Sequence, residues 1–135
     1  MPRKTLAKFP MSLDHLPVAI SQDHIARLQK IAERDYTNET NIIQALADRR
    51  RLKVLEALSE GELCACVLVQ LLGLKPSALS YHLSLLTDAG LIKARRDGSF
   101  QVYSLTPRGR SALELVQKLA SHKKKMTLTH TLDGD

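Results

Sequence analysis

Two cysteines separated by one residue, Cys64 and Cys66, are the side chains of this 135-residue chain best suited to chemistry. Thiolates are nucleophiles, and they bind soft metal ions and metalloids. Residues i and i+2 of a regular helix point about 200° apart, so the pair can share one ion only where it spans a helix start. We therefore expect Cys64 to be extended and Cys66 to lie near the N-cap, where the helix N-terminus stabilises a thiolate.

Three interpretations of this thiol pair stay open. The thiols can sense a metal or metalloid, or they can act as a redox switch that is oxidised to a disulfide or capped. They can also be two small apolar residues that happen to be cysteines. Two cysteines one residue apart do not make a disulfide framework, so a reducing cytoplasm is the expected compartment.

Charge and composition favour a helical domain that binds nucleic acid. The net charge is +6 and the pI is near 9.6, which suits nucleic acid but also serves plain solubility. Aromatic residues make up 4% and Trp is absent, so the core must be aliphatic and the chain mainly helical. No run approaches the roughly 18 apolar residues that span a bilayer, so we expect no membrane partner. No acid–base pair, nucleophile elbow or phosphate loop is recognisable, so we do not expect an enzyme.

The sequence pattern divides the chain into an arm, one domain and a tail. The arm holds three of the five prolines and shows no hydrophobic period, so we expect it to be flexible or draped over the domain. The last predicted helix ends in a lysine run, which suits a helix C-terminus. The predicted boundaries are 1–20 for the arm, 21–125 for the domain and 126–135 for a flexible tail.

Six helices and one hairpin are expected within the domain. Ser21, Asn41 and Asp48 are polar residues that can cap the first three helices. Pro76 suits the first position of the fifth helix, and Asp97-Gly98 is typical of a two-residue hairpin turn. The predicted helices cover about residues 21–34, 41–47, 48–60, 66–72, 76–88 and 106–125, and the predicted strands cover residues 91–96 and 99–105.

Three arginines, Arg49 to Arg51, open the third predicted helix. Cations at that end oppose the helix dipole by roughly a few tenths of a kcal/mol each. The run is therefore either a solvated basic face or a contact for DNA phosphates.

A helix, the three-residue break at residues 73–75, a second helix and a hairpin follow in the order of a winged helix-turn-helix. In this fold the second helix enters the major groove, and arginines of the hairpin suit the minor groove or the phosphates. The alternative for the hairpin is an ordinary exposed edge with charged residues. Hydroxyl groups have no strong base preference, so we expect modest sequence reading that leans partly on DNA shape. The predicted DNA-contacting residues are Ser77, Ser80, Tyr81, His82 and Ser84 of the helix and Arg95, Arg96, Ser99 and Gln101 of the hairpin.

Four stretches between Ile42 and Thr106 resemble the ArsR/SmtB family of metal-responsive repressors. They read ALADRRRLKVLEAL, ELCAC, LSYHLSLLTDAGLI and RRDGSFQVYSLT, and they follow the family's order. Arg49 departs from the pattern, because a Pro usually follows the Asp there. The resemblance implies a homodimer of winged helix-turn-helix domains that represses its own operon. Ser77, Ser80 and His82 stand where the family has its recognition-helix Ser/Thr and His.

ELCAC is similar to the ELCVC motif of the arsenic- and cadmium-sensing branches, which implies that Cys64 and Cys66 bind the effector. Val69 stands where some arsenic sensors have a third Cys, and the arm has no Cys to complete a four-sulfur site. Two thiolates and a third ligand can still hold trivalent arsenic or antimony, or another soft metal ion. His15 or Asp14 of the arm could supply that third ligand.

Apolar residues recur at helical spacing in the first and last predicted helices. We expect them to form the two-fold interface of a homodimer, although the same stripes could complete a monomer core. Such a dimer presents two recognition helices to successive major grooves, about 34 Å apart. The predicted interface residues are Ile25, Leu28 and Ile31 of the first helix and Leu113, Val116 and Leu119 of the last.

The sequence thus predicts a cytoplasmic transcriptional repressor that binds double-stranded operator DNA and is released by a small inorganic effector at its thiols. No cofactor is expected to be required for folding, and As(III), Sb(III) or a soft metal ion is the expected effector. Two alternatives stay open. One is a thiol redox-responsive regulator of the same fold, and the other is an adaptor that binds a protein partner through its apolar helices without touching DNA.

Overall fold

The structure is a computed structural model that describes residues 15–134, with side chains through residue 121. The chain divides into two compact units, residues 1–37 and residues 38–135. Helix α1 (Gln22–Ala32) belongs to the first unit, and the hydroxyl of Ser21 caps it by accepting the His24 N–H at 3.1 Å. The division therefore falls after α1, whereas the sequence predicted a domain that begins at residue 21. Within the described residues no helix is both long and apolar enough to cross a membrane.

Five further helices follow α1 in the described part of the chain. Asp48 caps the third helix as predicted, by accepting the backbone N–H groups of Arg50 and Arg51. Gly73 ends the fourth helix in the left-handed conformation at φ 63°, and Pro76 begins the fifth. The helices are α2 (Thr37–Leu46), α3 (Arg49–Ser59), α4 (Ala65–Leu72), α5 (Pro76–Asp88) and α6 (Pro107–Gly134).

Two predicted helix boundaries were wrong. Helix α2 begins at Thr37 rather than after Asn41, because Asp35 Oδ1 accepts both the backbone N–H and the hydroxyl of Thr37. Helix α6 continues to Gly134, so residues 126–134, predicted as a flexible tail, are helical. Its sequence contains neither Pro nor Gly between Gly109 and Gly134, so nothing local interrupts the backbone hydrogen bonds.

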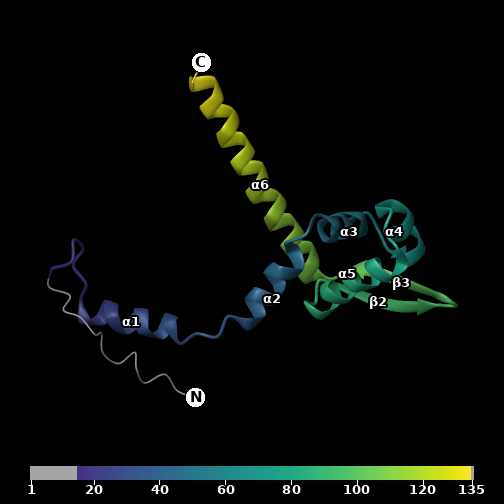
Figure 1. Ribbon diagram of the computed structural model, residues 1–135, viewed down its shortest axis with the longest axis horizontal. Helices are drawn as coiled ribbons and strands as arrows, with labels where there is room; N and C mark the ends of the chain where they lie inside the picture. The colour runs from purple at the N-terminus through teal and green to yellow at the C-terminus, as the bar shows by residue number, and fades with distance from the viewer. Residues whose placement is uncertain (1–14, 135) are drawn as a thin grey trace. The chain divides into compact units, whose positions relative to one another are not determined.

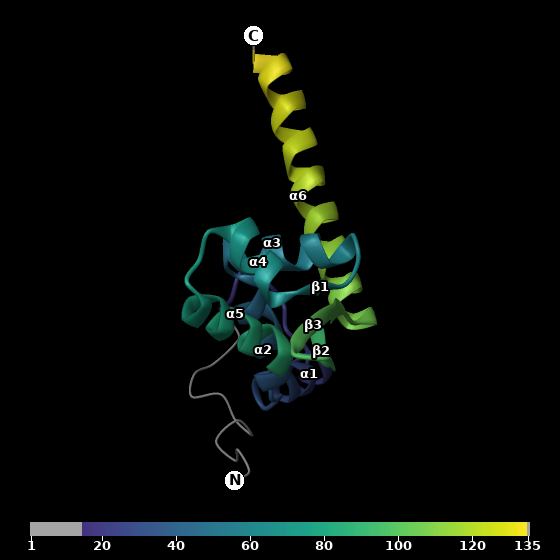
Figure 2. The same cartoon turned by 90° about the vertical axis from the view of Figure 1, so that its right-hand side faces the viewer.

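A three-stranded antiparallel sheet in the order β1-β3-β2 completes the fold (Figure 2). The predicted hairpin is present, but its turn is Gly98-Ser99, because Asp97 pairs with Phe100. Gly98 has φ 62°, which suits glycine at the first position of a two-residue loop. A two-residue strand that the sequence analysis did not predict pairs with the hairpin. The strands are β1 (Leu63–Cys64), β2 (Ile92–Asp97) and β3 (Phe100–Leu105).

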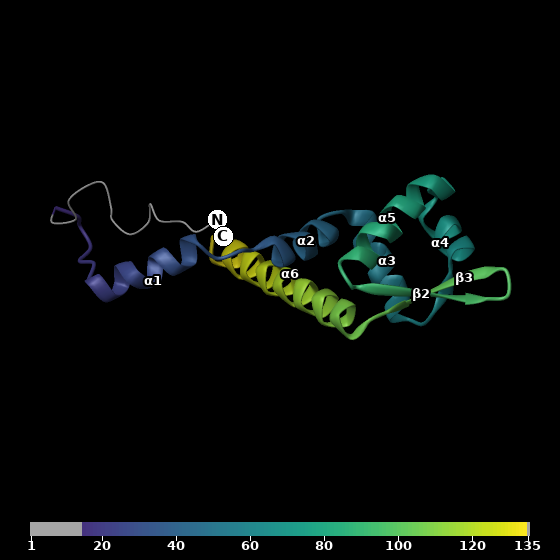
Figure 3. The same cartoon turned by 90° about the horizontal axis from the view of Figure 1, so that it is seen from below.

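The core lies between α3, α4, α5 and the start of the hairpin (Figure 1). Helix α5 contributes Leu79, Leu83 and Leu86 to it, while the hairpin beyond Ile92 projects past the helices (Figure 3). Helix α6 packs closely at Gly109, where an added Cβ would overlap the Leu91 carbonyl oxygen. The described fold is therefore a mainly helical winged helix-turn-helix, as predicted, with the hairpin of β2 and β3 as its wing.

Candidate nucleic-acid interface and thiol site

The outer face of α5 carries hydroxyl groups and no charge in its central turns. Leu79, Leu83 and Leu86 occupy the inner face, and the serines and Tyr81 between them are exposed. Tyr81 is 61% exposed and is the largest side chain on this face. Eight of the nine predicted DNA-contacting residues are exposed, namely Ser77, Ser80, Tyr81, Ser84, Arg95, Arg96, Ser99 and Gln101. Their contact with DNA stays a prediction, but their exposure allows it.

His82 is the exception, and its prediction as a DNA-contacting residue was wrong. It is 4% exposed, and its Nδ1 lies 3.0 Å from the Arg51 guanidinium. Arginine only donates, so Nδ1 acts as the acceptor. Burial lowers the pKa of His82, which favours the neutral ring that this hydrogen bond requires. His82 therefore fixes α5 from inside instead of reaching DNA.

Arg51 is buried and ties three helices together, so it is neither a solvated charge nor a phosphate contact. Its Nε donates to the Ala45 carbonyl at 2.8 Å and its Nη2 donates to the Gln44 carbonyl at 2.9 Å. With the third bond to His82, the side chain joins the end of α2 to α5. Within its run, Arg49 and Arg50 are exposed.

Arg50 donates two side-chain hydrogen bonds to Asp48 at the start of α3, from Nη2 to Oδ2 at 2.9 Å and from Nε to Oδ1 at 3.2 Å. These hydrogen bonds hold the pKa of the Asp48 carboxyl well below its usual range, and the helix N–H groups act in the same direction. The cap carboxylate therefore stays ionised and offsets the unfavourable position of the arginines at a helix N-terminus.

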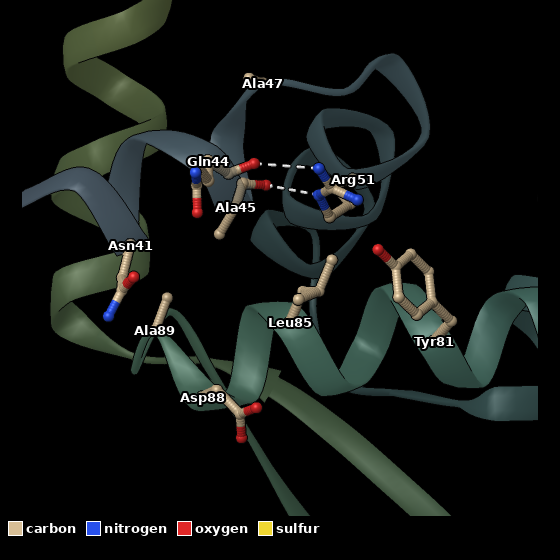
Figure 4. A pocket seen from close by; sticks show the side chains of 9 residues that line it. All are labelled: Asn41, Gln44, Ala45, Ala47, Arg51, Tyr81, Leu85, Asp88 and Ala89. Atoms are coloured by element: carbon tan, nitrogen blue, oxygen red, sulfur yellow. Dashed lines mark hydrogen bonds between the residues drawn. The ribbon is translucent and has the colours of Figure 1, made fainter. Parts of the chain in front are cut away.

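A pocket of about 530 Å³ opens beside the recognition helix between α2 and α5 (Figure 4). Arg51 forms part of its wall, and the Tyr81 hydroxyl points toward that guanidinium in Figure 4. The remaining lining residues are Asn41, Gln44, Ala45, Ala47, Leu85, Asp88 and Ala89. Neither cysteine lines this pocket, so the thiol pair occupies a different part of the molecule.

The wing carries the cationic groups, and one of them is already paired. Arg95 contacts Glu62 through two bonds, Nη2 to Oε1 at 2.8 Å and Nε to Oε2 at 3.2 Å. It also lies 3.6 Å from Asp97, while Arg96 has no ion pair among the described residues. The hydrogen bond from Arg95 lowers the pKa of Glu62. No local pattern in the sequence indicates this role of Glu62, because its partner is 33 residues away.

The two cysteines span the start of α4, as the sequence predicted, and the extended segment before this strand-to-helix corner is the unpredicted strand β1. Cys64 is the N-cap of α4 in an extended conformation, with φ −80° and ψ 158°, and Cys66 is exposed in the first helical turn. The Cys66 thiol hydrogen-bonds to Cys64 and lowers the pKa of Cys64, and the Val67 backbone N–H adds to the effect. The same contact raises the pKa of Cys66. Cys64 is therefore the thiol that ionises first.

A third metal ligand was not found within residues 15–121. No group of three His, Cys, Asp or Glu side chains there could hold a metal ion. Asp14 lies outside the described residues, and His15 belongs to the first of the two units. The donor set at this corner is therefore two thiols, which suits a soft ion or metalloid of low coordination number.

The predicted dimer-interface residues differ in exposure. Leu113 is 4% exposed and belongs to the core of the second unit, so its prediction as an interface residue was wrong. The first turns of α6 pack against α3 and the sheet, which places Leu113 inward. Further along α6, Leu115 and Leu119 are 59% and 63% exposed. In the first unit Ile25 is buried, while Leu28 and Ile31 are 37% and 49% exposed. Val116 is partly buried.

Comparison with known proteins agrees with this fold. The family model for bacterial regulatory proteins of the arsR family matches residues 48–94. The cadmium resistance transcriptional regulatory protein CadC homolog of Staphylococcus aureus is 31% identical over 109 residues, which cover 79% of this chain and 88% of the relative. An arsenical resistance operon repressor from the same organism is 39% identical over 70 residues, or 52% of this chain and 67% of the relative.

A solved structure from Mycobacterium bovis is similar over most of its length. It is the homodimeric winged helix-turn-helix DNA-binding domain of a possible ArsR-family transcriptional regulator. The TM-score is 0.59 at 28% identity, and the match covers 78% of this chain and 92% of that one. Together with the relatives, the described helices and wing show that the chain belongs to the ArsR family of bacterial regulatory proteins.

Proposed function

We propose that the protein is a homodimeric transcriptional repressor that leaves its operator when a thiol-binding effector occupies Cys64 and Cys66. Trivalent arsenic or antimony is the effector that suits two thiols best, and another soft metal ion is the broader class. The observation that carries the proposal is the pair of thiols at the start of α4, the first helix of the helix-turn-helix, where hydrogen bonding lowers the pKa of Cys64. Family membership, and relatives named for cadmium and arsenical resistance, support it.

DNA binding would use α5 for the major groove and the wing for the phosphates. The exposed serines of α5 can contact base edges or phosphate oxygens, and Arg95 and Arg96 supply charge at the wing. The net charge of +6 supports attraction to DNA. The central α5 face has no arginine or asparagine that could make a bidentate contact with a base. Much of the specificity would therefore come from DNA shape.

The effector chemistry is a ligand exchange without oxidation or reduction. When arsenite binds, each thiol would form one arsenic–sulfur bond and replace one hydroxide, and the thiol proton leaves with that hydroxide as water. Two water molecules are released in total, and one hydroxide stays on arsenic as the third ligand. Cys64 ionises first, so it would make the first bond, and Cys66 would close the ring.

Dimerisation would use α1 and the outer part of α6. Leu115 and Leu119 form an exposed apolar pair on α6, and Leu28 and Ile31 do so on α1. The structure from M. bovis is described as homodimeric, which supports the same assembly here. Sedimentation equilibrium at micromolar concentration should give twice the 15.0 kDa chain mass. A monomer under those conditions would contradict the dimer.

The deciding experiment measures binding to a duplex from immediately upstream of the protein's own coding sequence, with and without arsenite. The wild type should bind in the absence of arsenite and dissociate in its presence. The variant Cys64→Ser with Cys66→Ser should bind equally well and ignore arsenite. If that variant still dissociates with arsenite, the thiol mechanism is wrong, and if the wild type does not bind the duplex, the repressor assignment fails.

A redox switch at the same corner is the second candidate. The observation that favours it is the hydrogen-bonded pair of a thiolate-prone Cys64 and an exposed Cys66. A peroxide would oxidise the two thiols to one disulfide, and both peroxide oxygens would leave as water. Release from DNA by hydrogen peroxide but not by arsenite, with reversal by a dithiol reductant, would favour this candidate.

A further inference from the structure

Three residues from three strands form one row that joins the thiol corner to the wing. Cys64 of β1 pairs with Val102 of β3, and Val102 pairs on its other side with Arg95 of β2. Directly paired residues of an antiparallel sheet point their side chains to the same face. The order β1-β3-β2 can be followed in Figure 2. The thiol residue and a cationic wing residue are therefore separated by a single strand.

Glu62, which precedes the thiol residue Cys64 in the chain, binds Arg95 at the other end of this row. It lies two residues before Cys64, so its side chain is on the same face in an extended chain. Both carboxylate oxygens accept from the guanidinium, at 2.8 Å and 3.2 Å. This two-bond contact uses the same fork of N–H groups that binds a phosphate.

A DNA phosphate and Glu62 would therefore compete for one guanidinium. Both side chains of the pair are about half exposed, with 52% for Arg95 and 47% for Glu62. Exposed ion pairs are weak and exchange readily, so a phosphate can displace the carboxylate. The position of Glu62 then decides how available Arg95 is to DNA.

The strand that carries Glu62 into place is short. β1 consists of Leu63 and Cys64 only, and Cys64 is also the N-cap of α4. A ligand that joins Cys64 to Cys66 would fix this corner and keep β1 against β3, because Cys64 belongs to β1 and Cys66 to α4. Without such a ligand, two residues of pairing hold Glu62 opposite Arg95 only loosely.

We propose that Glu62 is a positioning residue that withholds Arg95 from DNA, and that effector binding at Cys64 and Cys66 reinforces this hold. The inference rests on the proposed function, because it assigns the route by which the thiol site weakens DNA binding. A ligand shifts such an equilibrium only by its preference for one arrangement, and here the preferred arrangement is the one with β1 in place.

The test compares Glu62→Gln with Glu60→Gln, which removes the same charge two residues earlier at the C-cap of α3. Each variant is titrated with the upstream duplex, with and without arsenite, after its thermal unfolding has been matched to the wild type. Glu62→Gln should bind DNA about two- to fivefold more tightly than Glu60→Gln, and arsenite should weaken its binding less than it weakens the wild type's. Equal affinity and equal arsenite response in the two variants would overturn the proposal.

A double substitution shows whether Glu62 acts through Arg95. In an Arg95→Gln background, Glu62→Gln should no longer change DNA affinity, because the guanidinium is gone. If Glu62→Gln raises DNA affinity as much in that background as in the wild type, Glu62 acts through its charge alone and the proposal fails. If the wild type binds DNA and responds to arsenite while these variants behave alike, only this inference falls. If the wild type does neither, the proposed function falls first.

Discussion

The recognition helix and the wing are held in place by different means. Helix α5 is fixed by buried leucines and by the internal hydrogen bond that Arg51 donates to His82. The wing beyond Ile92 is exposed along β2, and its Arg95 is held by a surface ion pair. A close-packed helix face cannot move without repacking the core, whereas a surface ion pair exchanges partners at little cost. Helix α5 is therefore a rigid element, and the wing is an adjustable one.

The two regions also differ in the kind of DNA contact that they favour. The central outer face of α5 offers neutral hydroxyls, whereas β2 offers arginines. Neutral contacts depend weakly on ionic strength, while each phosphate contact by a cation releases a counterion. Substitutions in α5 should therefore change stability and sequence specificity. Substitutions in the wing should change the salt-dependent part of the DNA affinity.

The largest expected difference between the two regions concerns stability. Leu86→Ala on α5 should lower the free energy of unfolding by about 2–5 kcal/mol, because Leu86 is 0% exposed and leaves a cavity. Phe100→Ala on the wing should change it by less than about 0.5 kcal/mol, because Phe100 is 58% exposed. Denaturant unfolding measures both values. Similar losses for the two variants would contradict the contrast.

The internal bonds of Arg51 should rank next. Arg51→Met should cost about 1–3 kcal/mol, because the Gln44 and Ala45 carbonyls lose their donor inside the structure. Arg49→Met is the matched control in the same helical turn, and its exposed side chain should contribute less than about 0.5 kcal/mol. The same unfolding assay applies. A loss for Arg49→Met as large as that for Arg51→Met would mean that general charge, rather than the buried bonds, stabilises α3.

The difference in DNA contacts can be measured by the salt dependence of binding. Arg96→Gln on the wing should reduce the slope of log K against log salt concentration by about 0.9, the value for one lost phosphate contact. Ser80→Ala on α5 should leave the slope unchanged while lowering affinity for the upstream duplex relative to a scrambled one. The idea fails if Ser80→Ala changes the slope and Arg96→Gln does not.

The smallest expected effect is a pH dependence from His82. Burial lowers its pKa in the folded protein, so between pH 6.5 and that lower value the unfolded chain binds a proton that the folded chain does not. Stability should therefore decrease as pH falls from 7 through this range. His82→Gln should flatten this part of the profile, because the substitution removes the only titrating group invoked here. A profile for His82→Gln that matches the wild type would remove His82 as the cause.

Local signals in the sequence were enough to predict most of the helix-turn-helix formed by α4 and α5. Gly73 and Pro76 frame the turn before α5 by backbone preferences that act within a few residues, and Cys64 sits at the predicted helix start. Tertiary contacts account for what was missed. Arg51 looks like its exposed neighbours in sequence, and only the carbonyls of α2 and the ring of His82 bring it inside. Likewise, β1 exists only through its pairing with a strand far along the chain.

Gly109 lets the start of α6 be held closely against the rest of the domain, so that the long helix beyond it would move about this fixed point. Gly109 lets the first turn of α6 lie directly against the Leu91 carbonyl, where the recognition helix passes into the wing. Thr106 holds this point in place, because its hydroxyl donates to the Gly90 carbonyl and its backbone N–H donates to the Leu91 carbonyl. The 28-residue helix extends about 42 Å from there, so a swing of about 5° at this point displaces its far end by about 4 Å. A displacement of several ångströms at the far end of α6 therefore corresponds to a much smaller movement at the junction between α5 and the wing.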